Sequence, residues 1–153
     1  MEEELKELPL KKEELEETKR ILERLKDRKG DTDPDRYERL LQRYEEKIEE
    51  LKPAVEQLTK EGITQKMELE DRLARQRSLA EEAEAEINEI NQLHQEGAMD
   101  EETYREERRR HQKQKSNAKK KASQIERELD EVKFYLTETG EVNYRKEKLQ
   151  GQS

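Results

Sequence analysis

Apolar residues recur along residues 37–58 at steps that alternate between four and three without interruption. This seam consists of Tyr37, Leu41, Tyr44, Ile48, Leu51, Val55 and Leu58. An α-helix brings residues three and four apart onto one face, whereas a half-buried strand places an apolar residue at every second position. The alternation is the heptad spacing of helices that pack against one another in coiled coils. It predicts a long helix whose partner is another helix.

Two later segments continue the same alternation. Their seams include Leu69, Leu73, Ile87 and Ile90 in residues 65–96, and Ile125, Leu129 and Val132 in residues 101–136. A further helix is expected from Pro9 to Lys29, because proline is tolerated in the first turn of a helix. The chain is therefore expected to be all-α, with four main helices.

Two glycines lie between the expected helices. Gly30 and Gly97 are each followed three residues later by an aspartate, Asp33 and Asp100. Glycine can take the left-handed conformation that closes a helix, and aspartate can accept hydrogen bonds from the first free N–H groups of the next helix. The pattern predicts two tandem antiparallel helical hairpins, with turns at 30–33 and 97–100. Because each seam occupies mostly two positions in seven, the hairpins are expected to form an elongated coiled coil.

The hairpins are expected to span residues 9–61 and 64–136. A frayed acidic N-terminus at 1–8 and a flexible polar tail at 137–153 would flank them.

The boundary between the hairpins is expected at Gly62. A left-handed Gly62 would end the helix, and Thr64 would then cap the next one. The alternative is one helix continuous through Gly62, at a cost of about 1 kcal/mol relative to alanine. Pro53 lies off the seam and is expected to kink the helix or to interrupt it briefly.

Composition limits the size of the core. Only 28% of the residues are hydrophobic and 48% are charged, whereas a globular domain is typically near half apolar and a quarter charged. Such a composition suits either disorder or long solvated helices, and the regular apolar spacing favours helices. The chain contains no cysteine, and it lacks both a long apolar run and the pattern of a signal peptide. We expect a cytoplasmic protein without a membrane span.

One segment of the chain is strongly basic although the protein carries a net charge of −8. Its nine cationic residues are Arg105, Arg108, Arg109, Arg110, Lys113, Lys115, Lys119, Lys120 and Lys121. A basic face on a helix is typical of a nucleic-acid interface or of a surface for an acidic partner.

An internal charge zipper is the alternative explanation of this basic run. Folding the second hairpin at Gly97 places the run opposite residues 76–92, which contain five glutamates. The expected pairs are Arg108–Glu89, His111–Glu86 and Lys115–Glu82. Each exposed pair contributes about 0.2–1 kcal/mol. Because five acids cannot neutralise nine bases, part of the positive surface is expected to remain free.

No arrangement of residues indicates catalysis. His94 and His111 lack the spacing of metal ligands, and all five glycines are isolated, so there is no glycine-rich phosphate loop. We expect no enzyme activity, no cofactor, no metal and no small-molecule substrate. The expected function is that of a scaffold or adaptor that self-associates or binds the helices of other proteins along its seams. The alternative is nucleic-acid or ribonucleoprotein binding through residues 105–121.

Overall fold

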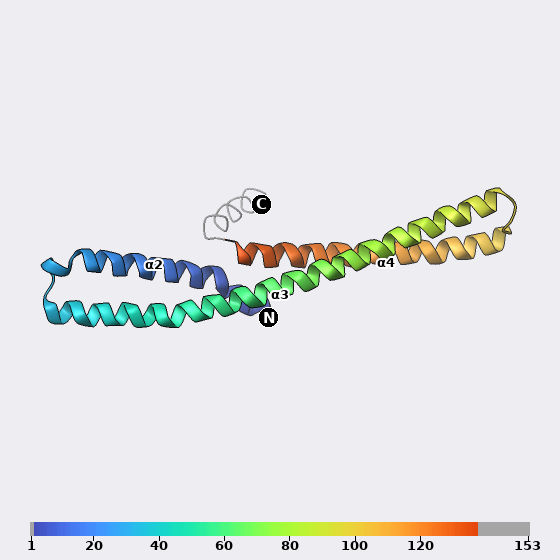
Figure 1. Cartoon of the computed structure of the whole chain (residues 1–153). Helices are drawn as coiled ribbons and strands as arrows, with labels where there is room; N and C mark the ends of the chain where they lie inside the picture. Colours follow the sequence, from blue (N-terminus) through green and yellow to red (C-terminus); the bar gives the residue numbers. More distant parts are fainter. Residues whose placement is uncertain (1, 138–153) are drawn as a thin grey trace, which may run out of the picture. The chain divides into compact units, whose positions relative to one another are not determined.

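The computed structural model describes residues 2–137. Its α-helices are α1 (Glu2–Leu5), α2 (Glu7–Asp27), α3 (Pro34–Gln95) and α4 (Glu101–Leu136), and a 3₁₀ helix, η1, spans Lys29–Asp31 (Figure 1). Residues 2–137 contain no β-strand. The predicted all-α class is confirmed. The predicted count of four main helices is wrong, because the described chain has three long helices and α1 is a single turn.

The chain divides into two compact units. The first unit comprises Met1–Gln65 and Glu131–Ser153, and the second comprises Lys66–Asp130. Helix α3 contributes its first part to the first unit and its remainder to the second. Helix α4 belongs to the second unit up to Asp130, and its last residues belong to the first.

In the first unit, α2 runs beside the first part of α3 in the opposite direction (Figure 1). Near the middle of α2, Glu14 Oε1 lies 3.1 Å from Lys47 Nζ. After the end of α2, Lys29 Nζ lies 5.8 Å from the centre of the Tyr37 ring, close to the start of α3. Going back along the chain from Lys29 to Glu14, the contact partner moves forward from Tyr37 to Lys47. The two helices are therefore antiparallel.

The first helical segment begins earlier than expected. Helix α2 starts at Glu7 rather than at Pro9, which is its third residue. Proline is tolerated there because the first N–H groups of a helix have no partner within the helix. Leu5 and Leu8 are fully buried. Within residues 4–8, these two leucines are buried, whereas Glu4, Lys6 and Glu7 are exposed.

Helix α3 does not end at Gly62. It continues from Pro34 to Gln95, so the favoured prediction of a helix end at this glycine is wrong. A Cβ added at Gly62 would lie 2.6 Å from Leu136 Cδ2 and 2.9 Å from Leu5 Cδ2. Gly62 therefore lets two leucine side chains approach the backbone of α3 and does not reverse the chain. The close approach explains why a residue of poor helix propensity occupies the middle of a helix.

Pro53 also lies within α3, and the helix continues through it. Of the two outcomes expected at this proline, a kink or a brief interruption, the interruption does not occur. A proline inside a helix removes one backbone hydrogen bond. Its ring faces solvent, so packing against the neighbouring helices does not have to accommodate it.

The predicted seam residues face the inside of the helical pairs. Buried members are Tyr37, Leu58, Leu69, Leu73, Ile87, Ile90, Ile125, Leu129 and Val132. Half-buried members are Leu41, Tyr44, Ile48, Leu51 and Val55, all from the first part of α3. The seam is thus covered more completely in the second unit than in the middle of the first.

The turn after α2 differs from the pattern expected for a glycine closure. Residues Lys29–Asp31 form η1, and Gly97 is the single residue within 2–137 that has a positive φ. Gly30 therefore does not repeat the conformation of Gly97. Asp33 nevertheless caps α3, since its Oδ2 accepts a hydrogen bond from the Arg36 N–H at 3.4 Å.

Candidate interaction surfaces

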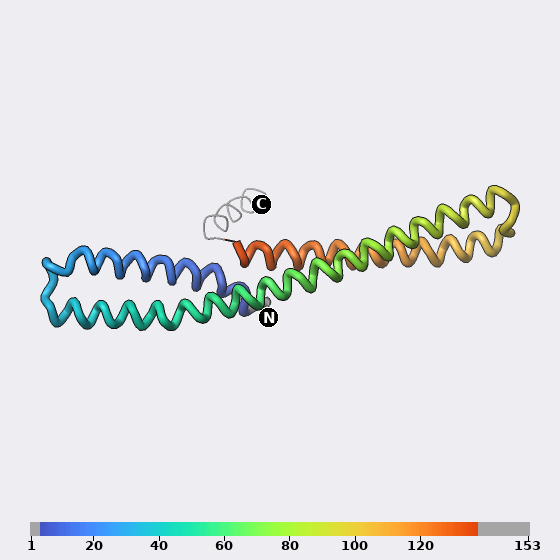
Figure 2. Tube along the Cα trace, in the orientation of Figure 1, coloured from blue at the N-terminus to red at the C-terminus, as the bar shows by residue number. Residues whose placement is uncertain are grey.

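The second unit is a hairpin in which the remainder of α3 runs antiparallel to α4 (Figure 2). Close to the turn, the Tyr104 hydroxyl donates a hydrogen bond to Asn91 Oδ1 at 2.8 Å. Far from the turn, the Arg77 guanidinium donates to Glu126 Oε1 at 2.9 Å. Contacts at both ends of the hairpin therefore join the two helices.

The turn of this hairpin is a Schellman motif, and it contains the left-handed glycine that the sequence predicts. Gly97 has a φ of 77°. The Ala98 N–H donates to Leu93 O at 2.9 Å, and the Gly97 N–H donates to His94 O at 3.1 Å. These two bonds satisfy carbonyl groups that have no partner within α3.

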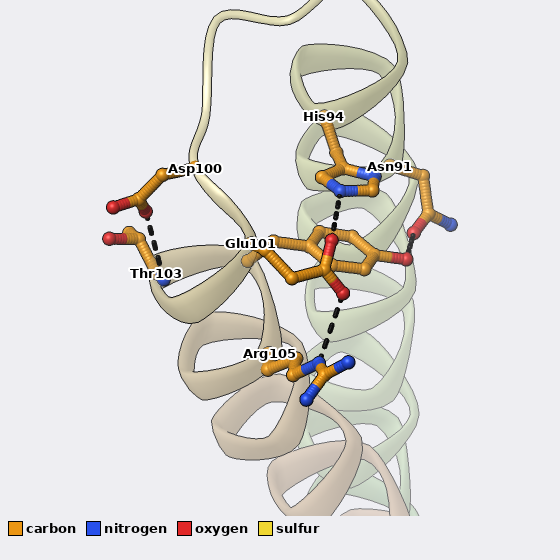
Figure 3. Close-up of polar contacts among 7 residues, drawn as sticks. Asn91, His94, Asp100, Glu101, Thr103 and Arg105 are labelled. Atoms are coloured by element: carbon orange, nitrogen blue, oxygen red, sulfur yellow. Dashed lines mark hydrogen bonds and ion pairs between the residues drawn. The ribbon is translucent and has the colours of Figure 1, made fainter.

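Asp100 caps the next helix, as predicted. Its Oδ1 accepts a hydrogen bond from the Thr103 N–H at 2.9 Å (Figure 3). Thr103, through its side chain and then its backbone, lowers the pKa of Asp100. A carboxylate at this position also interacts favourably with the positive end of the α4 dipole.

Beside the cap, five side chains form a polar and aromatic network (Figure 3). The rings of His94 and Tyr104 stack with their centres 3.9 Å apart and an angle of 12° between their planes. Glu101 Oε2 lies 2.7 Å from His94 Nε2, and Glu101 Oε1 accepts a hydrogen bond from Arg105 Nε at 3.0 Å. His94 first and Arg105 second lower the pKa of Glu101. The Tyr104–Asn91 hydrogen bond adjoins these contacts. Because the five side chains pair with one another across the turn, the network stabilises the turn.

The predicted zipper pairs are not formed. Arg108 lies over the ring of Tyr104, with 5.9 Å between the guanidinium carbon and the ring centre. The buried His111 contacts residues of its own helix, Gln114 at 3.1 Å and Glu107 at 3.5 Å. Lys115 does pair across the hairpin, but with Glu84.

The identity of the Lys115 partner follows from the direction in which helical side chains extend. A side chain leans toward the N-terminus of its own helix. In this antiparallel pair, Lys115 therefore leans toward the turn, where the facing residue of α3 has a higher number than 82. The hydrogen bond and the charge of Lys115 lower the pKa of Glu84.

Several charged residues on both helices have no such partner. Among the described residues, the side chains of Glu82, Glu86 and Glu89 make no ion pair or hydrogen bond. The same holds for Arg109, Lys113, Lys119, Lys120 and Lys121 of the basic run. The remaining cations of the run do have partners, since Arg105 pairs with Glu101 and Arg110 with Glu107. A zipper in this hairpin is thus reduced to the pair between Lys115 and Glu84, together with the pair between Arg77 and Glu126.

A groove of about 960 Å³ lies between α3 and α4 in the second unit. Its apolar lining residues are Leu79, Ala83, Ile90, Leu93, Met99 and Ala118. Its charged lining residues are Glu82, Glu86, Glu89, Glu107, Arg110 and Lys121. The side chain of Leu79 is 51% exposed. We refer to this feature as the α3–α4 groove.

Sequence reasoning missed the apolar side of the α3–α4 groove. The signal was present as a second stripe, in which Leu79, Ala83, Glu86, Ile90 and Leu93 follow one another at steps of four, three, four and three. This stripe shares Ile90 with the predicted seam and lies beside it on α3. Such a widened apolar face is typical of a helix that contacts more than one neighbour.

A second hollow, of about 610 Å³, lies along α4 alone. We refer to its lining residues as the basic stripe: Gln112, Lys115, Ser116, Lys119, Lys120, Ser123, Gln124 and Arg127. Within residues 2–137, the side chains of Lys119, Lys120 and Arg127 form no direct ion pair, although the charge of Lys119 helps to lower the pKa of Glu84. Arg127 was not among the predicted site residues, although it lies seven residues after Lys120 and eight after Lys119, which is a helical spacing.

Comparison with family models, with curated proteins and with solved structures finds no match to this chain. Over residues 2–137, no helix is both long enough and apolar enough to cross a membrane. The same residues contain no cluster of three or more histidine, cysteine or acidic side chains that could hold a metal ion.

Proposed function

We propose that this protein is a non-enzymatic helical scaffold that binds a helix of a partner in the α3–α4 groove. The observation that carries the proposal is the exposure of Leu79 beside buried Ala83 and Ile90. An amphipathic helix can lay its apolar face in such a groove and bury side chains at positions i, i+3, i+4 and i+7. Fully burying a leucine is favourable by about 1.5–3 kcal/mol, so covering the exposed half of Leu79 supports binding.

Self-association and an elongated coiled-coil form remain parts of this proposal. Both derive from the heptad seams, which occupy a narrow stripe on each helix. Small-angle X-ray scattering of the whole chain in solution measures its length.

A helical peptide provides the test of groove binding. Its sequence would carry leucine at heptad positions a and d and glutamine on both flanks, with a fluorescent label at one end. We expect the whole protein to raise the fluorescence anisotropy of this peptide, and Leu79→Glu to abolish the rise.

The matched control for this test is Leu10→Glu. Leu10 is exposed to a similar extent, 62%, but lies on α2 in the first unit. Binding that is lost equally in both variants, or that persists in Leu79→Glu, contradicts the α3–α4 groove as the binding site.

Nucleic-acid binding is a second candidate function, and the basic stripe favours it. Lysine and arginine side chains contact phosphates, and serine and glutamine side chains donate hydrogen bonds to the same backbone oxygens. The basic stripe holds residues of each type along one helix. Bases have no aromatic ring to stack on there, so the proposal is restricted to duplex DNA or RNA.

Binding of a labelled duplex at increasing salt concentration tests this second function. We expect the affinity to fall steeply with salt because phosphate contacts release counterions. The combined variant Lys119→Glu, Lys120→Glu and Arg127→Glu should lose binding. The control variant Arg43→Glu, Lys52→Glu and Lys60→Glu changes the net charge equally, on exposed residues of the first unit. Equal losses in the two variants would indicate an effect of net charge and would contradict a site on α4.

A further inference from the structure

The two rims of the α3–α4 groove carry different charges. On the α3 rim, Glu82, Glu86 and Glu89 are exposed and have no partner among the described residues. On the α4 rim, Arg110 Nη2 lies 2.8 Å from Glu107 Oε2. The positive charge of Arg110 and the negative charge of Glu107 largely cancel each other. Lys121 therefore carries the unpaired charge of this rim. The groove is therefore negative overall, and its negative charge is concentrated on α3.

We infer that the partner in the α3–α4 groove is a basic amphipathic helix. This inference rests on the proposed function, because it specifies the chemistry of the helix that the groove binds. The apolar face of the partner would cover Leu79, Ala83 and Ile90. Its lysine or arginine residues would lie on the flank that faces the three glutamates.

The spacing of the glutamates suits a helical partner. Glu82, Glu86 and Glu89 are separated by four and three residues, so they lie on one face of α3 and span about 10 Å along it. Cations at the same spacing on a second helix repeat along that helix at the same rise, so three pairs can form together. Exposed pairs of this kind contribute more to the choice of partner than to affinity.

The same charges disfavour acidic partners. A helix with glutamates on the corresponding flank would place like charges beside the α3 rim, which opposes binding. Residues 81–89 from a second copy of this chain would bring the same glutamates. A helix of another protein with basic flanks therefore fits the groove better than α3 of a second copy.

Two labelled peptides test the inference with the whole protein. Both would carry leucine at heptad positions a and d, one with lysine and the other with glutamate on its flanks. We expect the lysine peptide to bind about tenfold or more tightly than the glutamate peptide at low salt, and the difference to shrink as salt screens the charges.

A charge-neutral variant locates the effect. The combined variant Glu82→Gln, Glu86→Gln and Glu89→Gln should weaken binding of the lysine peptide about tenfold. It should also remove the preference for the lysine peptide over the glutamate peptide. The control variant Glu68→Gln, Asp71→Asn and Glu81→Gln removes the same charge from α3 outside the groove and should leave the preference intact. Thermal melting should be almost unchanged in the first variant, because its three carboxylates have no partner within residues 2–137.

The possible outcomes separate this inference from the proposed function. If the glutamate peptide binds as well as the lysine peptide, and both lose binding in Leu79→Glu, the groove binds helices but the inferred charge of the partner is wrong. If self-association of the chain displaces the lysine peptide, a second copy is the occupant and the inference is overturned. If neither peptide binds, the groove function itself fails. Equal weakening by the two triple variants would also overturn the inference, because it would indicate only the net charge of the protein.

Discussion

Gly97 has a backbone conformation that a residue with a side chain adopts only at a cost in free energy. Its φ of 77° lies in the left-handed region, and a Cβ added there would have open space around it. The cost of a side chain at this position is therefore conformational and not steric. For residues other than glycine, the left-handed conformation costs roughly 1–2 kcal/mol.

Gly97→Ala should lower the free energy of unfolding by about 1 kcal/mol, because alanine is strained at a positive φ. Urea unfolding followed by circular dichroism measures this change. Gly30→Ala is the control, since Gly30 also has open space around it but no positive φ. A loss of the same size in both variants would show that the conformation of Gly97 is not the cause.

Glu101 should make stability depend on pH. Its pKa in the folded protein is lowered from 4.5 by His94 and Arg105. A carboxylate with a depressed pKa stabilises the fold above its unfolded pKa, and this stabilisation is lost as the pH falls through the folded pKa. Melting temperatures should therefore fall as the pH drops below about 4.5.

The variant Glu101→Gln tests the contribution of this residue to the acid sensitivity. Asp100 and Glu84 also have lowered pKa values, so the variant should lose part of the pH dependence and not all of it. A melting curve that depends on pH as steeply in Glu101→Gln as in the parent protein between pH 6 and pH 3 would contradict the role of the network at the turn.

At the scale of elements, α3 is the helix on which both units are built. It continues through Pro53 and Gly62, two residues that commonly interrupt helices. Tertiary packing overrides the low helix propensity at Gly62, because Leu5 and Leu136 occupy the space beside the backbone. Packing of the two leucines therefore requires a glycine within the helix, at the residue where local propensity predicts that the helix ends.

Gly62→Ala tests this packing requirement. Alanine would improve helix propensity by about 1 kcal/mol, but the methyl group would meet Leu136 Cδ2 at 2.6 Å. Because overpacking costs about 1–3 kcal/mol, we expect a net loss of roughly 1 kcal/mol in the free energy of unfolding.

The double variant Gly62→Ala with Leu136→Ala provides the control for the clash. If the clash is the cause, the loss in the double variant should be smaller than the sum of the two single losses. Additive losses, or a stabilised Gly62→Ala protein, would show that the close approach of Leu136 does not limit this position.

At the scale of the whole molecule, the two units differ in how fully their seams are covered. In the first unit, Leu41, Tyr44, Ile48, Leu51 and Val55 are half-buried. The seam of the second unit is buried at Leu69, Leu73, Ile87 and Ile90. Since uncovered apolar surface favours association, the first unit is the place where we expect the chain to self-associate.

Light scattering across a range of protein concentrations measures this association. We expect the mass to rise from 18.5 kDa toward twice that value. Ile63→Glu, at an exposed apolar residue of the first unit, should hold the mass at that of one chain, and Leu79→Glu, in the second unit, should not. A mass of 18.5 kDa at every concentration would contradict self-association.

Local signals were sufficient to predict part of this structure from the sequence. The alternation of Tyr37, Leu41 and Tyr44 indicates a helix because it reflects the geometry of a single helix. The closure by Gly97 and the cap at Asp100 were predicted for the same reason, since each depends on residues no more than five positions away. Part of the positive surface was expected to remain free, and in the structure Lys120 and Lys121 are exposed and form no ion pair within residues 2–137.

Other features depend on contacts between residues far apart in the chain, and the sequence did not reveal them. Gly62 lies within α3 because Leu5 and Leu136 pack against it. The pairing of Lys115 with Glu84 depends on the lean of two side chains in antiparallel helices, which a simple alignment about Gly97 ignores. The α3–α4 groove likewise exists only once two helices are side by side.

The sequence by itself determined that the chain is helical, which face of each long helix is apolar, and where the second hairpin turns. These properties follow from backbone geometry and from interactions within a few residues. Tertiary structure decided that α3 is one helix through Gly62, and that Glu82, Glu86 and Glu89 line a groove. The physical reason is that helix propensity and exposed ion pairs are each worth only about 1 kcal/mol or less, so the packing of distant side chains determines the outcome.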